Sequence, residues 1–378
     1  MSYIWQNKKW PELKWDKDQV ENAYNRYLYK KGIADGVFTM LSDRTRQIMI
    51  AEILSSDTVS SSSIEGVKLQ YDSVYSSILK HLDVDMAIKA KHDRNAESVS
   101  SLVIDANRNH SPLTLERLMN WHCLLFDGVA KGFAPKHIGA FRSGPIYVVH
   151  SKQRETEILY EGVPAERISS EMERLIDYIN SEQEPNLLIR SAVASFWFVS
   201  IHPFYDGNGR ISRAIANYIL SMHSGSEFRP YNMSSAILKD RRGYYDSLNS
   251  AQNSEECDIT QWIVWYVDTI CTSLSDSVDQ CRKKLRVSVI MESLDPNLYN
   301  SRQMHMIYHL ANGSFFGKLT ADKWMKMTKC QSATATRDLS DLTEKGLLVR
   351  MGEGKKGTYY LLNPTFGESK NETANSFV

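Results

Sequence analysis

The chain of 378 residues is longer than one typical domain, so its length favours two or three domains with a sizeable core. Its 45 Lys and Arg residues equal its 45 Asp and Glu residues, which excludes a strong overall attraction to nucleic acid or acidic lipid. The five cysteines form no CxxC pair, which argues against a disulfide framework or a zinc site and favours a reducing cytoplasm. A charged N-terminus and the lack of an 18-residue apolar run predict neither a secretory signal peptide nor a membrane span.

Residues 1–98 are predicted to form a helical domain. The stretches 17–36 and 45–57 carry apolar side chains at a spacing of three and four, and few β-branched runs interrupt them. Three tryptophans near the N-terminus are interpreted as packing residues and not as a site, namely Trp5, Trp10 and Trp15.

Residues 99–287 contain the most apolar helical patterns and are predicted to form the core domain. Its most buried helix is expected at 185–200, beginning at a proline and ending just before His202. The stretch 144–164 breaks the helical pattern, because β-branched and aromatic residues flank a polar turn. We expect a two-stranded flap there, so the predicted fold class is all-α with one small β-hairpin in the core.

Residues 288–365 are predicted to form a winged-helix domain. The stretch 319–362 follows the order helix, turn, helix and two short strands. Between Gly317 and Tyr360, nine Lys or Arg residues oppose five Asp or Glu residues, and both DNA contact and a protein-binding adapter fit this excess. Residues 366–378 form a polar tail that is expected to be disordered. Whether the chain self-associates is left open by the sequence.

The segment "HPFYDGNGRISR", residues 202–213, joins the buried helix to a second amphipathic helix. Its loop contains Gly207 and Gly209, and a glycine-rich loop before a helix presents bare backbone N–H groups and the positive end of the helix dipole to an anion. Arg210 and Arg213, one turn apart, add charged donors, while Asn208 adds an amide donor. The segment therefore predicts a phosphate site.

Two further residues of this segment extend the prediction. The carboxylate of Asp206 would repel a phosphate unless Mg²⁺ lies between them, and one carboxylate plus phosphate oxygens is a common Mg²⁺ site. The expected ligand is therefore a Mg-nucleotide. His202 is the group of the segment that titrates near neutrality and could take a proton from an attacking hydroxyl.

The whole segment resembles the signature of the Fic family, His-Pro-Phe-x-Asp/Glu-Gly-Asn-Gly-Arg-x-x-Arg, at every fixed position. The resemblance extends over about residues 100–285, because "IGAFRSG", with Arg142, is similar to the family's segment before the flap and "DRRGYYDSLNSAQ" is similar to its helix beside the nucleobase. It implies an all-helical fold apart from the flap, and transfer of AMP from ATP to a protein hydroxyl.

The resemblance also implies roles for single residues. His202 would act as general base, Asp206 would hold Mg²⁺, and Arg213 would meet the γ-phosphate. The remaining phosphate contacts would come from Gly207, Asn208, Gly209 and Arg210, and the adenine pocket candidates are Tyr244 and Tyr245. A target segment could pair with the exposed strand edge of the flap, at Ile146, Tyr147, Val148 and Val149, with one hydroxyl pointing at the base.

A second motif suggests how the activity is restrained. "SSSSIEG" contains Ser61 and Glu65 four residues apart on one helix face, followed by Gly66 as a helix stop. It resembles the inhibitory helix of Fic proteins that carry this helix before the core. The resemblance implies that Glu65 pairs with Arg213 and occupies the charge that the γ-phosphate needs.

The sequence also bears on functions other than adenylyl transfer. The spacing of the GNGR residues and the intact Asp206 separate the chain from Doc-like kinases. A transcriptional regulator that senses a nucleotide and acts through the winged helix is the alternative from a different class. The stretch "GSFFGKL" at 313–319 is one residue short of a P-loop and has no Ser or Thr directly after Lys318, so it is rejected as a nucleotide site.

Overall fold

The structure is a computed structural model that describes residues 3–86, 90–130, 132–135, 137–152, 155–222, 231–312, 315, 318–352, 357–364 and 366. It divides into two compact units, residues 1–278 and 279–378. The residues predicted as a separate N-terminal domain belong to the same compact unit as the core. Among the described helices, none is long and apolar enough to cross a membrane.

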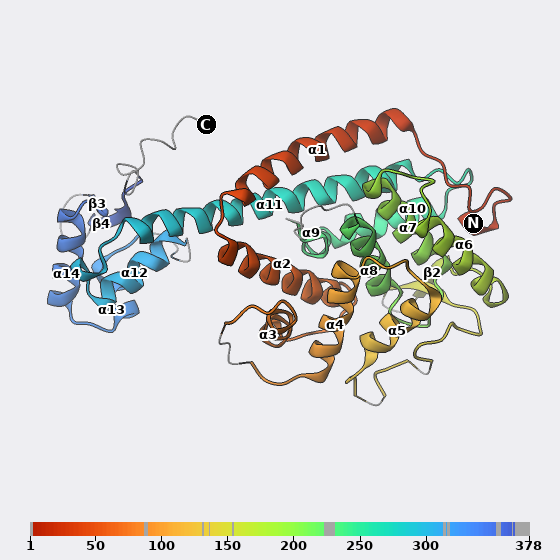
Figure 1. Cartoon of the computed structure of the whole chain (residues 1–378), viewed down its shortest axis with the longest axis horizontal. Coiled ribbons are helices and arrows are strands. Elements are labelled where there is room, and N and C mark those ends of the chain that lie inside the picture. Colours follow the sequence, from red (N-terminus) through yellow and green to blue (C-terminus); the bar gives the residue numbers. More distant parts are fainter. Residues whose placement is uncertain are drawn as a thin grey trace. The chain divides into compact units, whose positions relative to one another are not determined.

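The first unit is built from helices and one hairpin (Figure 1). Its elements in chain order are a 3₁₀ turn at Ile4–Gln6, α1 (Lys17–Thr39), α2 (Asp43–Ile64), α3 (Tyr71–His81), α4 (Arg94–Arg108), α5 (Leu115–Phe126), β1 (Tyr147–Lys152), β2 (Glu155–Glu161), a 3₁₀ turn at Ala165–Arg167, α6 (Ile168–Asn180), α7 (Leu187–Ile201), α8 (Asn208–Ser221), α9 (Met233–Lys239), α10 (Arg241–Gln252) and most of α11 (Thr260–Ser293).

The described residues of the second unit form three further helices and a small hairpin. After the end of α11, its elements are a 3₁₀ turn at Pro296–Leu298, α12 (Ser301–Ala311), α13 (Ala321–Thr328), α14 (Ser332–Glu344), β3 (Leu348–Met351) and β4 (Tyr359–Leu362). The two strands are antiparallel. The observed order agrees with the helix, helix, strand, strand pattern expected from the sequence, while a winged-helix function in DNA contact stays a prediction. The polar tail beyond Phe366 lies outside the described residues.

The α7 helix is buried within the first unit. Nearly all of its residues are buried because the sequence is apolar around the whole helix. Asn186 caps its first turn by accepting hydrogen bonds from the backbone N–H groups of Leu188 and Ile189. Its strongest packing partner is α8, which follows it directly and carries the second half of the glycine-rich segment. The predicted all-α fold with one small hairpin in the core is confirmed.

The hairpin and the N-terminal tryptophans are both fixed against α7. The β1 and β2 strands pair antiparallel, with Val148 opposite Tyr160, and the Tyr160 hydroxyl donates to the backbone oxygen of Ser200 at 2.8 Å. Trp10 packs edge-on against Trp197 of α7. The N-terminal aromatic residues are therefore packing residues, as the sequence indicated.

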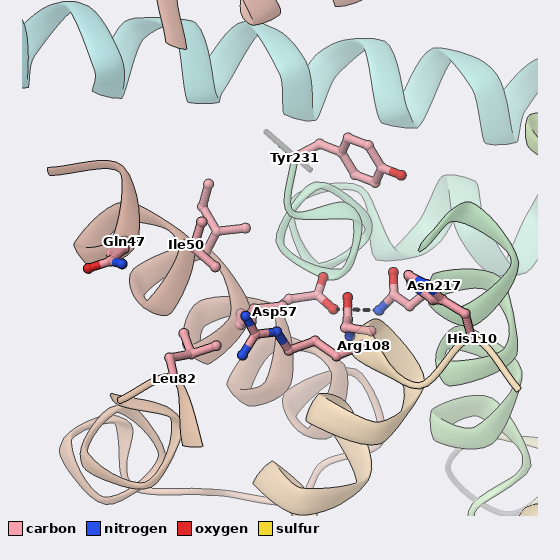
Figure 2. A pocket seen from close by; sticks show the side chains of 11 residues that line it. Gln47, Ile50, Asp57, Leu82, Arg108, His110, Asn217 and Tyr231 are labelled. Atoms are coloured by element: carbon pink, nitrogen blue, oxygen red, sulfur yellow. Dashed lines mark hydrogen bonds between the residues drawn. The ribbon is translucent and has the colours of Figure 1, made fainter. Parts of the chain in front are cut away.

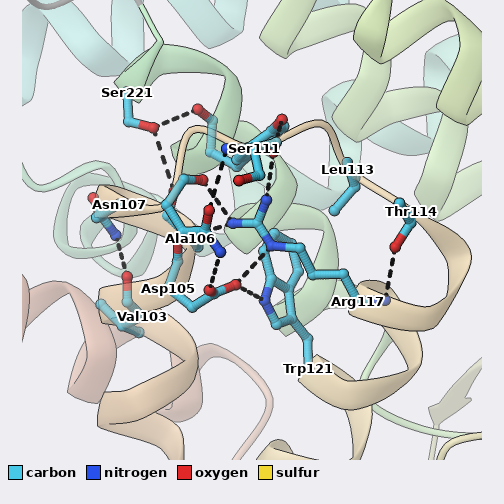
Figure 3. A network of polar contacts seen from close by, with 12 residues as sticks. Val103, Asp105, Ala106, Asn107, Ser111, Leu113, Thr114, Arg117, Trp121 and Ser221 are labelled. Carbon is cyan, nitrogen blue, oxygen red and sulfur yellow. Dashed lines mark hydrogen bonds and ion pairs between the residues drawn. The ribbon is translucent and has the colours of Figure 1, made fainter.

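A second set of contacts fixes the segment between α4 and α5. Arg117 of α5 donates to a carboxylate oxygen of Asp105 and to three backbone oxygens between Asp105 and Ser111 (Figure 3). The guanidinium also lies over the rings of Trp121 and Tyr218, and the Tyr218 hydroxyl of α8 donates to the oxygen of Ser111. One cation thus joins α4, α5 and α8.

Candidate active site

The loop between α7 and α8 is shaped by backbone conformation and by one amide. His202 ends α7 in the left-handed region at φ 54°, and Gly207 precedes α8 at φ 86°. The Asn208 side chain accepts from the N–H of Phe204 at 3.0 Å and donates to its carbonyl oxygen at 2.7 Å. These two bonds hold the turn, and the role of Asn208 as a donor to phosphate stays a prediction.

His122 of α5, which no sequence pattern predicted as a functional residue, supports the same loop. Its ring stacks on Phe204 with centroids 3.9 Å apart. Nδ1 accepts from the N–H of Gly139 at 2.9 Å, so Nε2 carries the proton and donates to the carbonyl oxygen of Asp206 at 3.1 Å. Burial lowers the pKa of His122, and a neutral ring suits both bonds. No local motif marked this residue, because its partners lie elsewhere in the sequence.

His202 is oriented by the end of its own helix. Nδ1 lies 3.2 Å from the carbonyl oxygen of Val199, and a carbonyl can only accept, so Nδ1 carries the proton. Nε2 therefore keeps its lone pair. Burial lowers the pKa of His202 to about 4, so the ring is neutral at pH 7 and able to accept a proton.

Arg142 ties the segment before the flap to the His202 loop. The buried guanidinium donates to the carbonyl oxygens of His202 and Gly144, each at 2.7 Å, and to that of Ile201 at 3.3 Å. It also donates to the carbonyl of Val163, beyond the second strand. A single side chain thus fixes the flap against the candidate general base.

The N-terminus of α8 presents two buried guanidinium groups. Arg210 donates weakly to Asp206 Oδ1 at 3.4 Å and lies over the Phe126 ring. The Nε atom of Arg210 and the Nη1 atom of Arg213 are buried and have no hydrogen-bond partner among the described residues. An unpartnered buried donor is costly, so these two N–H groups favour an acceptor-rich ligand such as a phosphate.

Arg213 is already engaged by the end of α2. Its Nε and Nη2 atoms donate to the hydroxyl and carbonyl oxygens of Ser61, each at 2.8 Å, and Nη2 also donates to Glu65 Oε1 at 2.9 Å. Burial disfavours the charged guanidinium, but Glu65 outweighs this effect and the pKa of Arg213 is raised. Helix α2 ends at Ile64, and Gly66 follows with φ 78°, where a side chain would be strained.

Asp206 lies at the exposed side of the loop. Its side chain is 51% exposed, and Oδ1 accepts from the N–H of Gly207 at 2.5 Å. Within the described part of the chain, no three or more His, Cys, Asp or Glu residues gather as a metal cluster. An accessible single carboxylate beside phosphate donors suits Mg²⁺ that takes its other ligands from the nucleotide and water.

The two adenine-pocket candidates differ in exposure. Tyr244 is buried and packs against Trp262 and Trp265, and burial raises its pKa to about 12. Tyr245 is 38% exposed, with the Arg241 guanidinium over its ring. Tyr245 is therefore the member of the pair with an accessible ring.

The side chains of the flap residues alternate between exposed and packed, as expected for a strand with one face open to solvent. Tyr147 and Val149 are 46% and 47% exposed, whereas Val148 packs against the core. Ile146 lies just before β1, and its carbonyl accepts from the N–H of Gly162.

Part of this site matches the model of a known family. Residues 112–220 match the model of the Fic/DOC family. This segment, less than half of the chain, is similar to Fic/DOC domains and contains the loop from His202 to Arg213. Residues 3–84 match a separate model, described as a domain of unknown function, DUF4172.

Curated proteins similar to the chain are named protein adenylyltransferases. Fic-1 of Caenorhabditis elegans is 26% identical over 147 residues, covering 38% of this chain and 25% of that protein. A probable protein adenylyltransferase of Aquifex aeolicus is 22% identical over 212 residues, covering 54% of this chain and 58% of that protein. Fic of Nematostella vectensis is 26% identical over 247 residues, covering 63% of this chain and 46% of that protein. The chain thus spans between a quarter and about three-fifths of the length of these relatives.

Solved structures share the fold. A Fic family protein from Desulfovibrio desulfuricans superposes with a TM-score of 0.53 at 18% identity, covering 92% of this chain and 97% of that one. A Fic-1 fragment from Caenorhabditis elegans gives a TM-score of 0.51 at 18% identity, covering 71% of this chain and 74% of that one. At such identities the likeness concerns the fold alone.

Proposed function

We propose that the chain is a protein adenylyltransferase that moves AMP from Mg-ATP to a Ser, Thr or Tyr hydroxyl of a target protein or of itself. The observation that carries the proposal is one loop with a neutral, oriented imidazole at its start and unpartnered buried guanidinium donors at its end. A base and an anion site joined in this way suit attack of a hydroxyl on a phosphate. The names of the Fic/DOC relatives agree with this chemistry.

In the proposed reaction, the target hydroxyl oxygen attacks the α-phosphorus of ATP. The new P–O bond forms as the bond from this phosphorus to the β-phosphate oxygen breaks, and pyrophosphate leaves. The hydroxyl proton passes to Nε2 of His202, a contribution of about 10²- to 10⁴-fold in rate. Arg210 and the backbone N–H groups at the start of α8 hold the phosphates, and Arg213 is assigned to the γ-phosphate.

Mg²⁺ would be held by Asp206 and would neutralise phosphate charge when bound. The target would add its backbone to the open edge of the flap near Tyr147 and Val149, whose side chains are exposed. Such pairing tolerates many sequences, because it uses main-chain hydrogen bonds.

The same proposal includes restraint by Glu65. Its carboxylate holds the guanidinium that is assigned to the γ-phosphate, so ATP that enters would be turned out of line for attack. A misplacement of about 1 Å can cost about 10²-fold in rate. Basal transfer is therefore expected to be low.

The test is self-labelling with ATP that carries the label on the α-phosphate. The proteins are wild type, Glu65→Gly, Glu65→Gln and Glu65→Gly combined with His202→Ala. We expect strong labelling of Glu65→Gly, intermediate labelling of Glu65→Gln, and almost none of the wild type or the double variant. Equal labelling of wild type and Glu65→Gly would remove Glu65 from the inhibitory role, and labelling of the double variant would remove His202 from the base role.

ADP provides a control for the inhibitory part. It lacks the γ-phosphate, so its affinity should hardly differ between wild type and Glu65→Gly, whereas the affinity for ATP should rise in the variant. If Glu65 has only a structural role at the helix end, Glu65→Gly should lower the stability of the protein and should not raise its transfer activity.

A further inference from the structure

A cavity of about 160 Å³ borders α2, α4 and α8 (Figure 2). There the Asp57 carboxylate accepts from the backbone N–H of Ser234 at 2.8 Å and from Nδ2 of Asn217 at 3.1 Å. Arg108 and Tyr231 on its wall also have partners. These polar groups are thus engaged within the chain, whereas the second unit carries charges that are not.

The second unit carries a set of exposed cations. They are Lys326 near the end of α13, Lys329 in the turn after it, Arg337 of α14 and Arg350 of β3. Across the part of the chain that the structure describes, no carboxylate forms an ion pair with any of the four. Their charge is therefore available to an anionic partner.

The acidic residues of α14 do little to cancel this charge. Asp338 is buried and pairs with Arg302 at 2.9 Å, and Asp341 pairs with Lys345 at 2.6 Å. Glu344 is exposed, but it lies at the C-terminal end of the helix. The N-terminal half of α14 and the turn before it are thus left positive.

The α14 helix has one buried face and one open face. The buried face packs in the core of the second unit through Ala335, Leu339 and Leu342. The open face carries small or polar side chains at a spacing of three and four, namely Ala333, Thr336, Arg337 and Ser340. The helix of 13 residues is about 20 Å long, and the major groove of duplex DNA, about 12 Å wide, admits a helix with such a face.

The hairpin of the second unit keeps its cation apart from an apolar patch. Arg350 and Leu348 lie on one face of β3, and Leu348 is buried in the same core as α14. The apolar patch on the other face consists of Val349 and Met351, which are 39% and 38% exposed, with Leu361 opposite Val349. The cation is therefore on the face of the hairpin that packs against α14.

We propose that the second unit binds double-stranded DNA, with the open face of α14 in the major groove. Duplex DNA carries one negative charge for about every 1.7 Å of its axis, which complements the four unpaired cations. Lys326, Lys329 and Arg350 would contact phosphates beside the groove, and Arg337 would reach the base edges. A protein partner would instead cover the apolar patch of the hairpin.

The test measures the fluorescence anisotropy of labelled duplexes of about 20 base pairs, two turns of DNA, with the full chain. A mixed-sequence DNA duplex is compared with an RNA duplex of the same sequence, whose deep and narrow major groove does not admit a helix. We expect DNA to bind about tenfold more tightly, or better. The logarithm of its binding constant should fall by about 3 for each tenfold rise in salt concentration, since three phosphate contacts contribute about 0.9 each. No DNA binding at about 50 mM salt and about 10 μM protein, or equal binding of the two duplexes, overturns the proposal.

Single variants at exposed positions assign the contacts. Lys326→Gln and Lys329→Gln should each lower the salt dependence by about 1 while they keep the preference for DNA over RNA. Arg337→Gln should remove that preference, because Arg337 lies in the middle of the open face. Glu344→Gln should bind DNA at least as tightly as wild type, since it removes a charge that repels phosphate. Wild-type strength and wild-type preference in Arg337→Gln would contradict the placement of α14 in the groove.

Two controls locate the surface. Arg174→Gln removes an exposed cation of α6, in the first unit, and should bind DNA like wild type. Val349→Ser changes the apolar patch of the hairpin and should also bind DNA like wild type. If Val349→Ser loses DNA binding while Arg337→Gln keeps it, the apolar patch and not α14 is the docking surface, and the proposal is wrong.

DNA binding and adenylyl transfer can be told apart with one variant. His202→Ala should bind DNA like wild type, because DNA binding does not involve the phosphate loop. A chain that fails to bind DNA leaves the proposed transfer standing, and a chain that transfers no AMP leaves DNA binding standing.

Discussion

The Nδ1 atom of His202 lies 3.2 Å from the carbonyl oxygen of Val199, one turn back in α7. This bond decides which ring nitrogen keeps its lone pair: the carbonyl can only accept a hydrogen bond, so Nδ1 carries the proton and Nε2 is free. The left-handed conformation of His202, at φ 54°, ends the helix and turns the ring at the same residue. Helix termination and base orientation thus depend on one residue.

The pH profile of transfer follows from this environment. Since burial lowers the pKa of His202 to about 4, the ring stays neutral well below the usual histidine value of about 6.5. In the Glu65→Gly background we expect the rate to show no break near pH 6.5 and to fall only as the pH approaches 4. The measurement is initial labelling rate against pH, and a break near 6.5 that disappears in His202→Ala would contradict it.

The same shift predicts a loss of stability in acid. The folded chain binds the His202 proton less readily than the unfolded chain, so stability is present above pH 6.5 and is lost as the pH falls toward 4. His202→Ala should weaken this dependence in thermal unfolding, while it leaves ATP affinity nearly unchanged and lowers transfer by about 10²- to 10⁴-fold.

Arg142→Lys is predicted to damage both stability and transfer. The guanidinium donates to the carbonyls of His202, Gly144, Ile201 and Val163, and one ammonium cannot reach this set. We expect a loss on the order of 2 to 3 kcal/mol in unfolding free energy and a lower turnover with little change in ATP affinity. Arg174→Lys, at an exposed position on α6, is the control and should stay within about 0.5 kcal/mol of wild type. Equal stability of the two variants would rule out this role.

The sequence predicted features that depend on neighbours in the chain. The apolar α7, the glycine loop and the short hairpin are local patterns, and each lies where it was expected. His122 and the bonds from Arg142 to the carbonyls of Val163, Ile201 and His202 were not predicted, because these contacts join residues far apart in the chain. The bonds between Asn208 and Phe204 were not predicted for another reason: an amide in a phosphate loop can bond to a ligand, to the turn or to both, and the sequence alone does not show the bonds within the turn.

Asp206→Ala is predicted to remove the Mg²⁺ dependence of nucleotide binding. Asp206 is the accessible carboxylate of the loop, and without it the cation would lose its protein ligand. In titrations with and without Mg²⁺, the affinity for ATP should differ clearly for the wild type and hardly at all for Asp206→Ala. Asp246→Ala, an exposed carboxylate on α10, is the control. A Mg²⁺ effect that persists in Asp206→Ala would place the metal ligand elsewhere.

Gly209→Ala should reveal how tightly Glu65 is held. Gly209 lies in the first turn of α8, and a Cβ there would be 2.1 Å from Glu65 Oε1. The carboxylate cannot simply swing away, because Arg213 binds it on a side chain that is only 6% exposed. In the wild-type background, Gly209→Ala should therefore lower the unfolding free energy by about 1 to 3 kcal/mol, as overpacking of a protein interior does.

In the Glu65→Gly background, Gly209→Ala should raise the unfolding free energy instead of lowering it. The clash with Glu65 is gone, the remaining close neighbour of the Cβ is Nη1 of Arg213 at 3.2 Å on a flexible side chain, and alanine in a helix is favoured over glycine by about 0.5 to 1 kcal/mol. Thermal and denaturant unfolding of wild type, the two single variants and the double variant gives the interaction free energy directly. If Gly209→Ala has the same effect in both backgrounds, Glu65 moves freely out of the site and its bond to Arg213 is too weak to restrain ATP. A reversal of sign would instead measure how firmly that bond holds the carboxylate against the start of α8.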